Sequence, residues 1–108
     1  YENHRYPEAE EIFRRLIQRN EFDASAHNNL GQTYARQRKF REAIAAFHRS
    51  LELNNASPLP HLNLSGVYSA LEMPADARKH FDIAQHLLNR TNERSLPDTT
   101  RHEEEPRQ

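Results

Sequence analysis

Apolar residues recur along the N-terminal part of the chain at the three- and four-residue spacing of an amphipathic helix. Within residues 6–20 they are Ala9, Ile12, Phe13, Leu16 and Ile17. Pro7 suits the first turn of this helix, where a missing backbone N–H costs nothing. No stretch of the chain alternates apolar and polar residues as a half-buried strand does. The pattern therefore predicts an all-α protein whose first helix covers residues 6–20.

Start and stop signals predict a helical hairpin in residues 24–55. Asp23 can cap a helix that runs to about Gln37. A polar turn follows, and Phe40 opens a second helix that ends near Asn54. The residues of this second helix that we expect to face inward are Ala43, Ile44, Phe47, Leu51 and Leu53.

A second hairpin is predicted in residues 58–90. Ser57 followed by Pro58 marks the start of a helix that runs to about Leu71, and Pro74 starts the next one. The apolar positions of that last helix are Ala77, Phe81, Ala84, Leu87 and Leu88. We therefore expect about five helices in all, joined by short turns.

The two hairpins repeat one another residue by residue. The segment Ala26–Tyr34 is restated as Pro60–Tyr68, an interval of 34 residues. A fixed period of this length indicates stacked helical hairpins, because one hairpin cannot bury its apolar face alone. The matched pairs are His27 and His61, Asn29 and Asn63, Leu30 and Leu64, Tyr34 and Tyr68, Ala43 and Ala77, and Phe47 and Phe81, while Gly31 is replaced by Ser65.

These residues resemble the signature of the tetratricopeptide repeat (TPR) family. The chain departs from that signature in having histidine where tryptophan is frequent, and Asn55 and Asn89 where proline is frequent. The resemblance covers residues 6–90, about two and a half repeats, with 6–20 as the second helix of a truncated unit. The positions that match the repeat core are His27, Leu30, Gly31, Tyr34, Ala43, Phe47 and Ser50, then His61, Leu64, Ser65, Tyr68, Ala77, Phe81 and Ala84.

The resemblance implies a right-handed solenoid of helix pairs with a concave groove that binds peptides. The first helix of each pair lines that groove. At about 100° per residue, one stripe of these helices falls opposite the packing residues. This stripe, together with Asn28, supplies the predicted groove residues, which are Ser25, Asn28, Asn29, Gln32, Arg36, Leu59, Asn63, Gly66 and Ala70.

Two of the groove residues, Asn29 and Asn63, occupy equivalent positions in the repeat. An asparagine amide can donate to and accept from a peptide backbone at once, and Gly66 and Ala70 leave room for that backbone. The pair is similar to the asparagine ladder in the TPR superhelix of O-GlcNAc transferase, which implies reading of an extended backbone. The alternative is that both are tolerated polar residues on a solvated face. The carboxylate clamp of chaperone-binding TPR domains is matched only at Asn63.

Composition narrows the function classes without identifying a partner. With 15 Lys and Arg against 16 Asp and Glu, no overall charge draws the chain to nucleic acid or to an anionic membrane. No apolar run approaches the roughly 20 residues that span a bilayer. The absence of cysteine excludes disulfides and thiolate metal sites. The compartment stays open, with the cytoplasm slightly favoured.

The composition changes at Thr91. Residues 91–108 contain one leucine, two prolines and the acidic run Glu103–Glu105, too little apolar surface to offset the entropy of ordering. We predict a polar, disordered tail, which is either a linker or an acidic docking or autoinhibitory segment. Because the chain begins at Tyr1 inside an unfinished repeat, we also expect it to be part of a longer protein.

Candidate chemistry outside the groove is sparse. The seven histidines include no pair with the i, i+4 spacing of helical zinc sites, and His80 lies four residues after Asp76 instead. No phosphate loop, nucleophile elbow or paired carboxylate site occurs, so we predict no catalytic residue, no cofactor and no metal. One hairpin turn carries a basic cluster that is either solvated or attracts an acidic peptide or a phosphate group. This basic cluster consists of Arg36, Arg38, Lys39 and Arg41.

The sequence predicts a non-catalytic adaptor or scaffold that binds an extended peptide or partner segment in the groove. The alternative is an assembly module that self-associates, or docks to a neighbouring domain, through its last helix. In that helix Ile83, Leu87 and Leu88 have no amphipathic helix after them to cover them. The partner is expected to be a protein or peptide of unknown identity, and neither nucleic-acid binding nor membrane insertion is expected.

Overall fold

The computed structural model describes residues 5–95, with side chains described as far as residue 90. Within this range the chain forms helices and turns and no strand, which confirms the all-α prediction. Each helix begins and ends within a few residues of its predicted bounds, except at the C-terminal end of the last one. The helices are α1 Tyr6–Arg19, α2 Ala24–Arg36, α3 Phe40–Leu53, α4 Leu59–Ala70 and α5 Pro74–Ser95.

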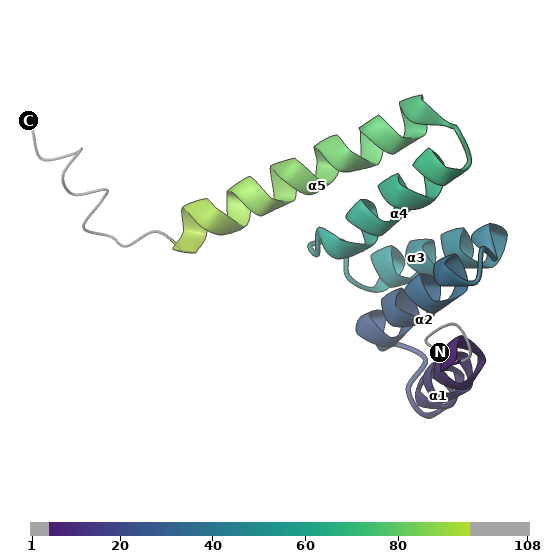
Figure 1. Ribbon diagram of the computed structural model, residues 1–108. Helices are drawn as coiled ribbons and strands as arrows, with labels where there is room; N and C mark the ends of the chain where they lie inside the picture. Colours follow the sequence, from purple (N-terminus) through teal and green to yellow (C-terminus); the bar gives the residue numbers. More distant parts are fainter. Residues whose placement is uncertain (1–4, 96–108) are drawn as a thin grey trace, which may run out of the picture.

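Successive helices pack side by side and form an elongated stack (Figure 1). α2 and α3 form one antiparallel hairpin, α4 and α5 form the next, and α1 packs against α2 at the other end. The stack measures 60 × 35 × 28 Å, a shape that follows from each hairpin contacting only its neighbours. α2 also contacts α4 directly. The first helices of the two repeats are therefore adjacent, as a shared groove requires.

The turns repeat along with the helices. Arg38 has φ 62° and Glu72, 34 positions later, has φ 60°. Both residues follow the last turn of a helix, and the next backbone N–H donates back to a tyrosine carbonyl, at 2.9 Å to Tyr34 and 2.8 Å to Tyr68. This left-handed residue closes the end of the helix and reverses the chain. The two hairpins therefore share one turn geometry although their turn sequences differ.

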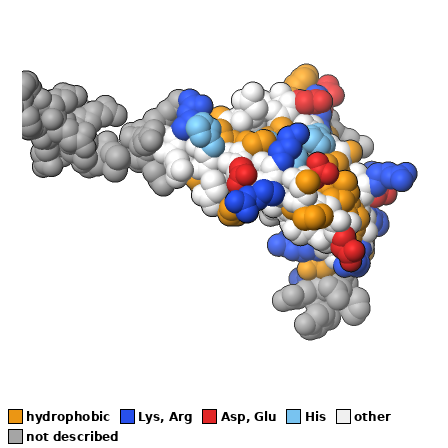
Figure 2. Space-filling model, turned by 90° about the horizontal axis from the view of Figure 1, so that it is seen from above, with side chains coloured by type: hydrophobic (Ala, Val, Ile, Leu, Met, Phe, Trp, Pro, Cys, Tyr) orange, Lys and Arg blue, Asp and Glu red, His pale blue; other side chains and the backbone are white. Residues whose placement is uncertain are grey.

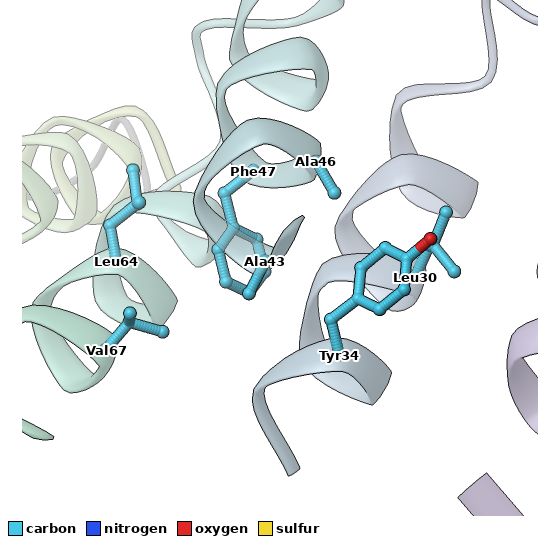
Figure 3. Packing of buried hydrophobic residues seen from close by; sticks show 7 residues of the cluster. All are labelled: Leu30, Tyr34, Ala43, Ala46, Phe47, Leu64 and Val67. Atoms are coloured by element: carbon cyan, nitrogen blue, oxygen red, sulfur yellow. The ribbon is translucent and has the colours of Figure 1, made fainter. Parts of the chain in front are cut away.

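The core lies where α2, α3 and α4 meet (Figure 3). The Phe47 side chain on α3 is completely buried between Leu30 and Tyr34 of α2 on one side and the α4 side chains on the other. Its ring lies against the backbone of Gly31, where no side chain intervenes. The residues of this core are Leu30, Tyr34, Ala43, Ala46, Phe47, Leu64 and Val67.

The prediction that Phe81 faces inward as part of the repeat core is wrong, because its side chain is 41% exposed. Phe47, at the equivalent position, is covered by α4 of the following repeat. Among the described residues no helix follows α5, so nothing covers Phe81 in the same way. Of the other predicted core positions, Ala77 and Ala84 are buried, while His27, His61, Ser65 and Tyr68 are partly buried.

The two ends of the described chain also differ from its middle. On α1, Ile12 is 56% and Leu16 is 42% exposed, and no helix among the described residues covers that face. At the other end α5 continues through residues 91–95, beyond the predicted start of the polar tail at Thr91. The disorder predicted for the rest of the tail, and its acidic run, lie outside the described residues.

Candidate functional site

Two cavities lie along the contact between α2 and α4. The larger cavity has a volume of about 370 Å³ and the smaller cavity about 150 Å³. The larger is lined by Gln32, Ala35, Arg36, Arg38, Phe40, Phe47, Leu62, Asn63, Gly66, Val67 and Ala70. The smaller is lined by Ala24, Ser25, Asn28, Asn29, Ser50, Asn54, Ser57, Leu59 and Pro60.

Every predicted groove residue lines one of these two cavities. The members at the larger cavity are Gln32, Arg36, Asn63, Gly66 and Ala70. Those at the smaller cavity are Ser25, Asn28, Asn29 and Leu59. Sequence reasoning missed the walls that α3 and the turn contribute, namely Phe40, Phe47 and Arg38. It also missed Leu62, which lies one helical turn before Gly66 and could have been found by extending the same stripe.

A chain of three amides connects α2 to α4 between the cavities. The Asn63 Nδ2 donates to Asn28 Oδ1 at 2.9 Å, and Gln32 Nε2 donates to Asn63 Oδ1 at 3.4 Å. Asn28 is 7% exposed, so this bond satisfies an amide oxygen that has little access to solvent. Asn28 was predicted to bind a ligand in the groove. The structure makes it mainly a support for Asn63.

Asn29 and Asn63 therefore differ despite their equivalent places in the repeat. Asn63 already uses one N–H and one lone pair within the protein, and keeps one of each. The Asn29 side chain is partly exposed and has no hydrogen-bond partner among the described residues. Of the two amides, Asn29 has its full hydrogen-bonding capacity available to a ligand.

The larger cavity combines an apolar wall with an open backbone segment. Phe47 and Val67 are buried at its base, and Leu62 is partly buried beside them. Gly66 is exposed, and a Cβ built on it would meet no atom within 4 Å. A ligand backbone can therefore approach α4 closely at this point.

One of the basic residues of the turn, Lys39, forms an ion pair with α1. Lys39 Nζ lies 3.4 Å from Glu10 Oε1, which also accepts a hydrogen bond from Gln37 Nε2 at 3.0 Å. The hydrogen bond from Gln37, with smaller contributions from Arg14 and Lys39, lowers the pKa of Glu10 below its ordinary value despite its desolvation. This carboxylate ties α1 to the turn after α2. Lys39 is thereby partly neutralised.

Arg36 and Arg38 remain at the larger cavity without a carboxylate partner among the described residues. The Arg38 guanidinium lies over the Phe40 ring at 5.2 Å from its centroid, a cation–π contact that leaves its N–H donors available. On the face of the molecule seen in Figure 2, charges of both signs are interspersed with hydrophobic side chains. The positive character of the larger cavity is therefore local.

A histidine cluster lies outside the groove, where α3, α4 and α5 meet. His61 Nδ1 and His80 Nδ1 are 3.0 Å apart, and the two rings stack with centroids separated by 5.2 Å. The side-chain hydrogen bond of His80 is therefore made to another helix, whereas Asp76 on its own helix acts on it only electrostatically. Within the described part of the chain, no group of three or more His, Cys, Asp or Glu side chains is placed to hold a metal ion.

None of the described helices is long and apolar enough to cross a bilayer. Comparison with curated proteins finds no match. A model of the tetratricopeptide repeat family matches residues 1–60, which include α1, α2, α3 and the first residues of α4. Repeats of this family generally mediate protein–protein interaction and are typically non-catalytic. The match and the stacked hairpins agree, and the chain belongs to the tetratricopeptide repeat family.

Proposed function

We propose that this chain is a scaffold or adaptor module that binds an extended segment of a partner protein in the groove between α2 and α4. The observation that carries the proposal is that both cavities lie along one pair of helices. Between them the Asn29 and Asn63 amides have hydrogen-bonding capacity that the protein does not use, close to the open backbone at Gly66. An extended segment binds in a groove that supplies hydrogen-bond partners for its backbone and pockets for its side chains.

The groove supplies hydrogen-bond partners for the backbone of an extended segment that is transferred out of water. Each buried N–H and C=O of the ligand must find a partner, because an unpaired polar group costs about 1–3 kcal/mol. Asn29 supplies a complete amide, and Asn63 supplies its remaining N–H and lone pair. The cavities on either side of the amide bridge accept alternate side chains of the segment.

A peptide selection on the folded chain tests the groove. Random twelve-residue peptides displayed on phage are selected against the wild type, and their affinities are measured by fluorescence anisotropy. Gly66→Leu fills the larger cavity and is expected to weaken binding by about tenfold or more. Asn29→Ala removes one hydrogen-bonding amide and is expected to weaken binding by about 3- to 10-fold.

The matched control is Ala45→Leu, which places the same leucine side chain at an exposed position of α3 that lines neither cavity. It is expected to leave the affinity unchanged. Asn63→Ala is avoided, because it would also remove the donor that satisfies the buried Asn28 amide. Selected peptides that bind the Gly66→Leu variant as tightly as the wild type would refute groove binding.

A second candidate function, self-association through the C-terminal hairpin, is favoured by the exposure of Phe81. This ring lines a shallow cavity of about 320 Å³ with Ser65, Ser69, Pro74, Ala77 and Arg78. A second copy stacked on this face would cover it as α4 covers Phe47. Light scattering over a concentration series would then show a rising mass that Phe81→Asp abolishes. A constant monomer mass at high concentration argues against this function.

A further inference from the structure

We propose that the larger cavity of the groove selects partner segments in which a carboxylate side chain lies next to an aliphatic side chain. This inference rests on the proposed groove function and adds a ligand chemistry to it. It commits the groove to an acidic–aliphatic peptide rather than to peptides in general.

The first argument is the charge that remains after the protein's own ion pairs are made. Of the basic cluster, Lys39 is paired with Glu10 at 3.4 Å, and Arg41 is exposed on α3 without lining the cavity. Arg36 and Arg38 both line the cavity. Neither has an ion pair within the part of the chain that the structure describes. None of the residues lining the cavity is acidic, so the two guanidinium groups lack a counter-charge there.

The second argument is the order of chemistry along α2. Gln32 and Asn63 present amides in the middle of the groove, and Arg36 follows Gln32 by one helical turn. A backbone held at the amides therefore places a nearby side chain beside Arg36 and Arg38. A guanidinium forms charge-assisted, often bidentate hydrogen bonds with a carboxylate, roughly twice as strong as neutral ones.

The third argument is the apolar wall opposite the arginines. Leu62, Val67 and Ala70 of α4 line the same cavity, with Phe40 and Phe47 contributed by α3. A volume of about 370 Å³ is within the range of ligand-binding cavities, roughly 300–1,000 Å³. An aliphatic side chain of the ligand would bury apolar surface against this wall, while its acidic neighbour faces the arginines. A purely acidic segment would leave the wall exposed to water.

The experiment compares two end-blocked nine-residue peptides that differ only in charge. Both repeat the triplet serine, leucine and an acidic or amide residue, with glutamate in one and glutamine in the other. End blocking removes the terminal carboxylate as a competing source of the interaction. Fluorescence anisotropy with the full chain is expected to show about tenfold tighter binding of the glutamate peptide at about 50 mM salt. The difference should shrink as salt screens the charges.

Variants of the cavity arginines assign the preference. The double variant Arg36→Gln, Arg38→Gln is expected to bind both peptides with the affinity that the wild type shows for the glutamine peptide. Arg41→Gln removes a neighbouring positive charge that does not line the cavity, and is expected to retain most of the preference. Arg36, Arg38 and Arg41 are all exposed, so these substitutions test binding with little effect on folding.

The outcomes separate this inference from the proposed function. If both peptides bind equally, and Gly66→Leu weakens both, the groove function stands and the acidic preference is overturned. If neither peptide binds, or if Gly66→Leu has no effect on binding, the acidic–aliphatic assignment fails. Groove binding of these peptides, on which the assignment rests, then fails as well. A glutamate preference that survives the double arginine variant also overturns the assignment.

Discussion

At the residue scale, the two glycines of the chain lie in opposite environments. A Cβ on Gly31 would lie 2.6 Å from Phe47 Cε1 and 2.7 Å from its Cδ1, whereas a Cβ on Gly66 would meet nothing within 4 Å. The Phe47 ring is fully buried, and the Cβ would press directly against its edge. Gly31 is therefore required for packing. Its counterpart Ser65 is tolerated where the neighbouring Phe81 is less tightly enclosed.

Alanine at the two glycines should change stability in opposite directions. Gly31→Ala overpacks the core and is expected to lower the free energy of unfolding by about 1–3 kcal/mol. Gly66→Ala gains helix propensity without a clash and is expected to raise it by about 0.5–1 kcal/mol. Urea unfolding followed by circular dichroism measures both. Equal effects at the two positions would contradict the packing assigned to Phe47.

The His61–His80 pair is expected to make folding sensitive to acid. Burial lowers the pKa of both rings below the ordinary value of about 6.5, and neighbouring positive groups add to the effect. Those neighbours are His48 for both rings, and His61 and Lys79 for His80, against which the Asp76 carboxylate acts weakly. A bond between two Nδ1 atoms also requires that at least one ring be neutral.

The sign of this pH dependence follows from the lowered pKa values. The folded state disfavours the protonated rings, so stability is full above the unfolded pKa of about 6.5 and is lost as the pH falls from there through the lowered pKa of the folded state. The urea midpoint should therefore be lower at pH 5.5 than at pH 8. His80→Asn should flatten this difference, while His86→Gln, at an exposed position of α5, should leave it unchanged. An unaltered pH profile in His80→Asn would exclude the pair as its source.

At the element scale, the hairpin turns hold a non-glycine residue in the left-handed region twice. Glu72 has φ 60°, a conformation that costs an L-residue roughly 1–2 kcal/mol and glycine almost nothing. Its side chain is exposed and lines none of the cavities described above. The turn is retained because the backbone bond from Met73 N to Tyr68 O closes the end of α4.

Glycine at this turn should stabilise the protein. Glu72→Gly relieves the left-handed strain and is expected to raise the free energy of unfolding by about 1 kcal/mol. The matched control Glu42→Gly places the same substitution at an exposed position inside α3, where it should lower stability by about 1 kcal/mol. Thermal and urea unfolding report both changes. A loss of stability in Glu72→Gly would show that the turn is held by something other than its backbone geometry.

At the scale of the whole molecule, position along the stack decides what a repeated residue contributes. Phe47 lies inside the stack and is fully buried, whereas Phe81 occupies the same repeat position at the last hairpin and is 41% exposed. Stability in such a stack comes from each repeat and from its interface with the next one. Phe81 has only the first of these contributions within the described residues.

Leucine at the two phenylalanines should separate the contributions. Phe47→Leu leaves unfilled space in the core and is expected to cost about 1–2 kcal/mol, whereas Phe81→Leu should cost less than about 0.5 kcal/mol. Urea midpoints at low protein concentration, where association is minimal, make the comparison. Equal losses would mean that the C-terminal face is covered in solution. That result would favour self-association as the second candidate function.

The sequence by itself determined the helices, their order and the repeat. Capping by Asp23, the spacing of apolar residues and the interval of 34 residues are properties of neighbouring positions, and a helix converts such positions directly into faces. The predicted groove residues line the two cavities for the same reason. The sequence did not determine their ligand. The periodicity shows which residues lie on the groove face of a helix, but not which of them already form hydrogen bonds or ion pairs within the protein.

Tertiary structure alone decided those pairings. Asn63 bonds to Asn28, Lys39 is paired with Glu10, and His61 meets His80, in each case between different helices or between a helix and a turn. Exposure of Phe81 was decided in the same way, by the absence of a following helix among the described residues. These contacts depend on distances between residues far apart in the chain, which periodicity within one helix does not encode. The repeat in the sequence identifies the family. Only the stacking of the hairpins determines that the side chains of Asn29, Arg36 and Arg38 are left without hydrogen-bond or ion-pair partners among the described residues.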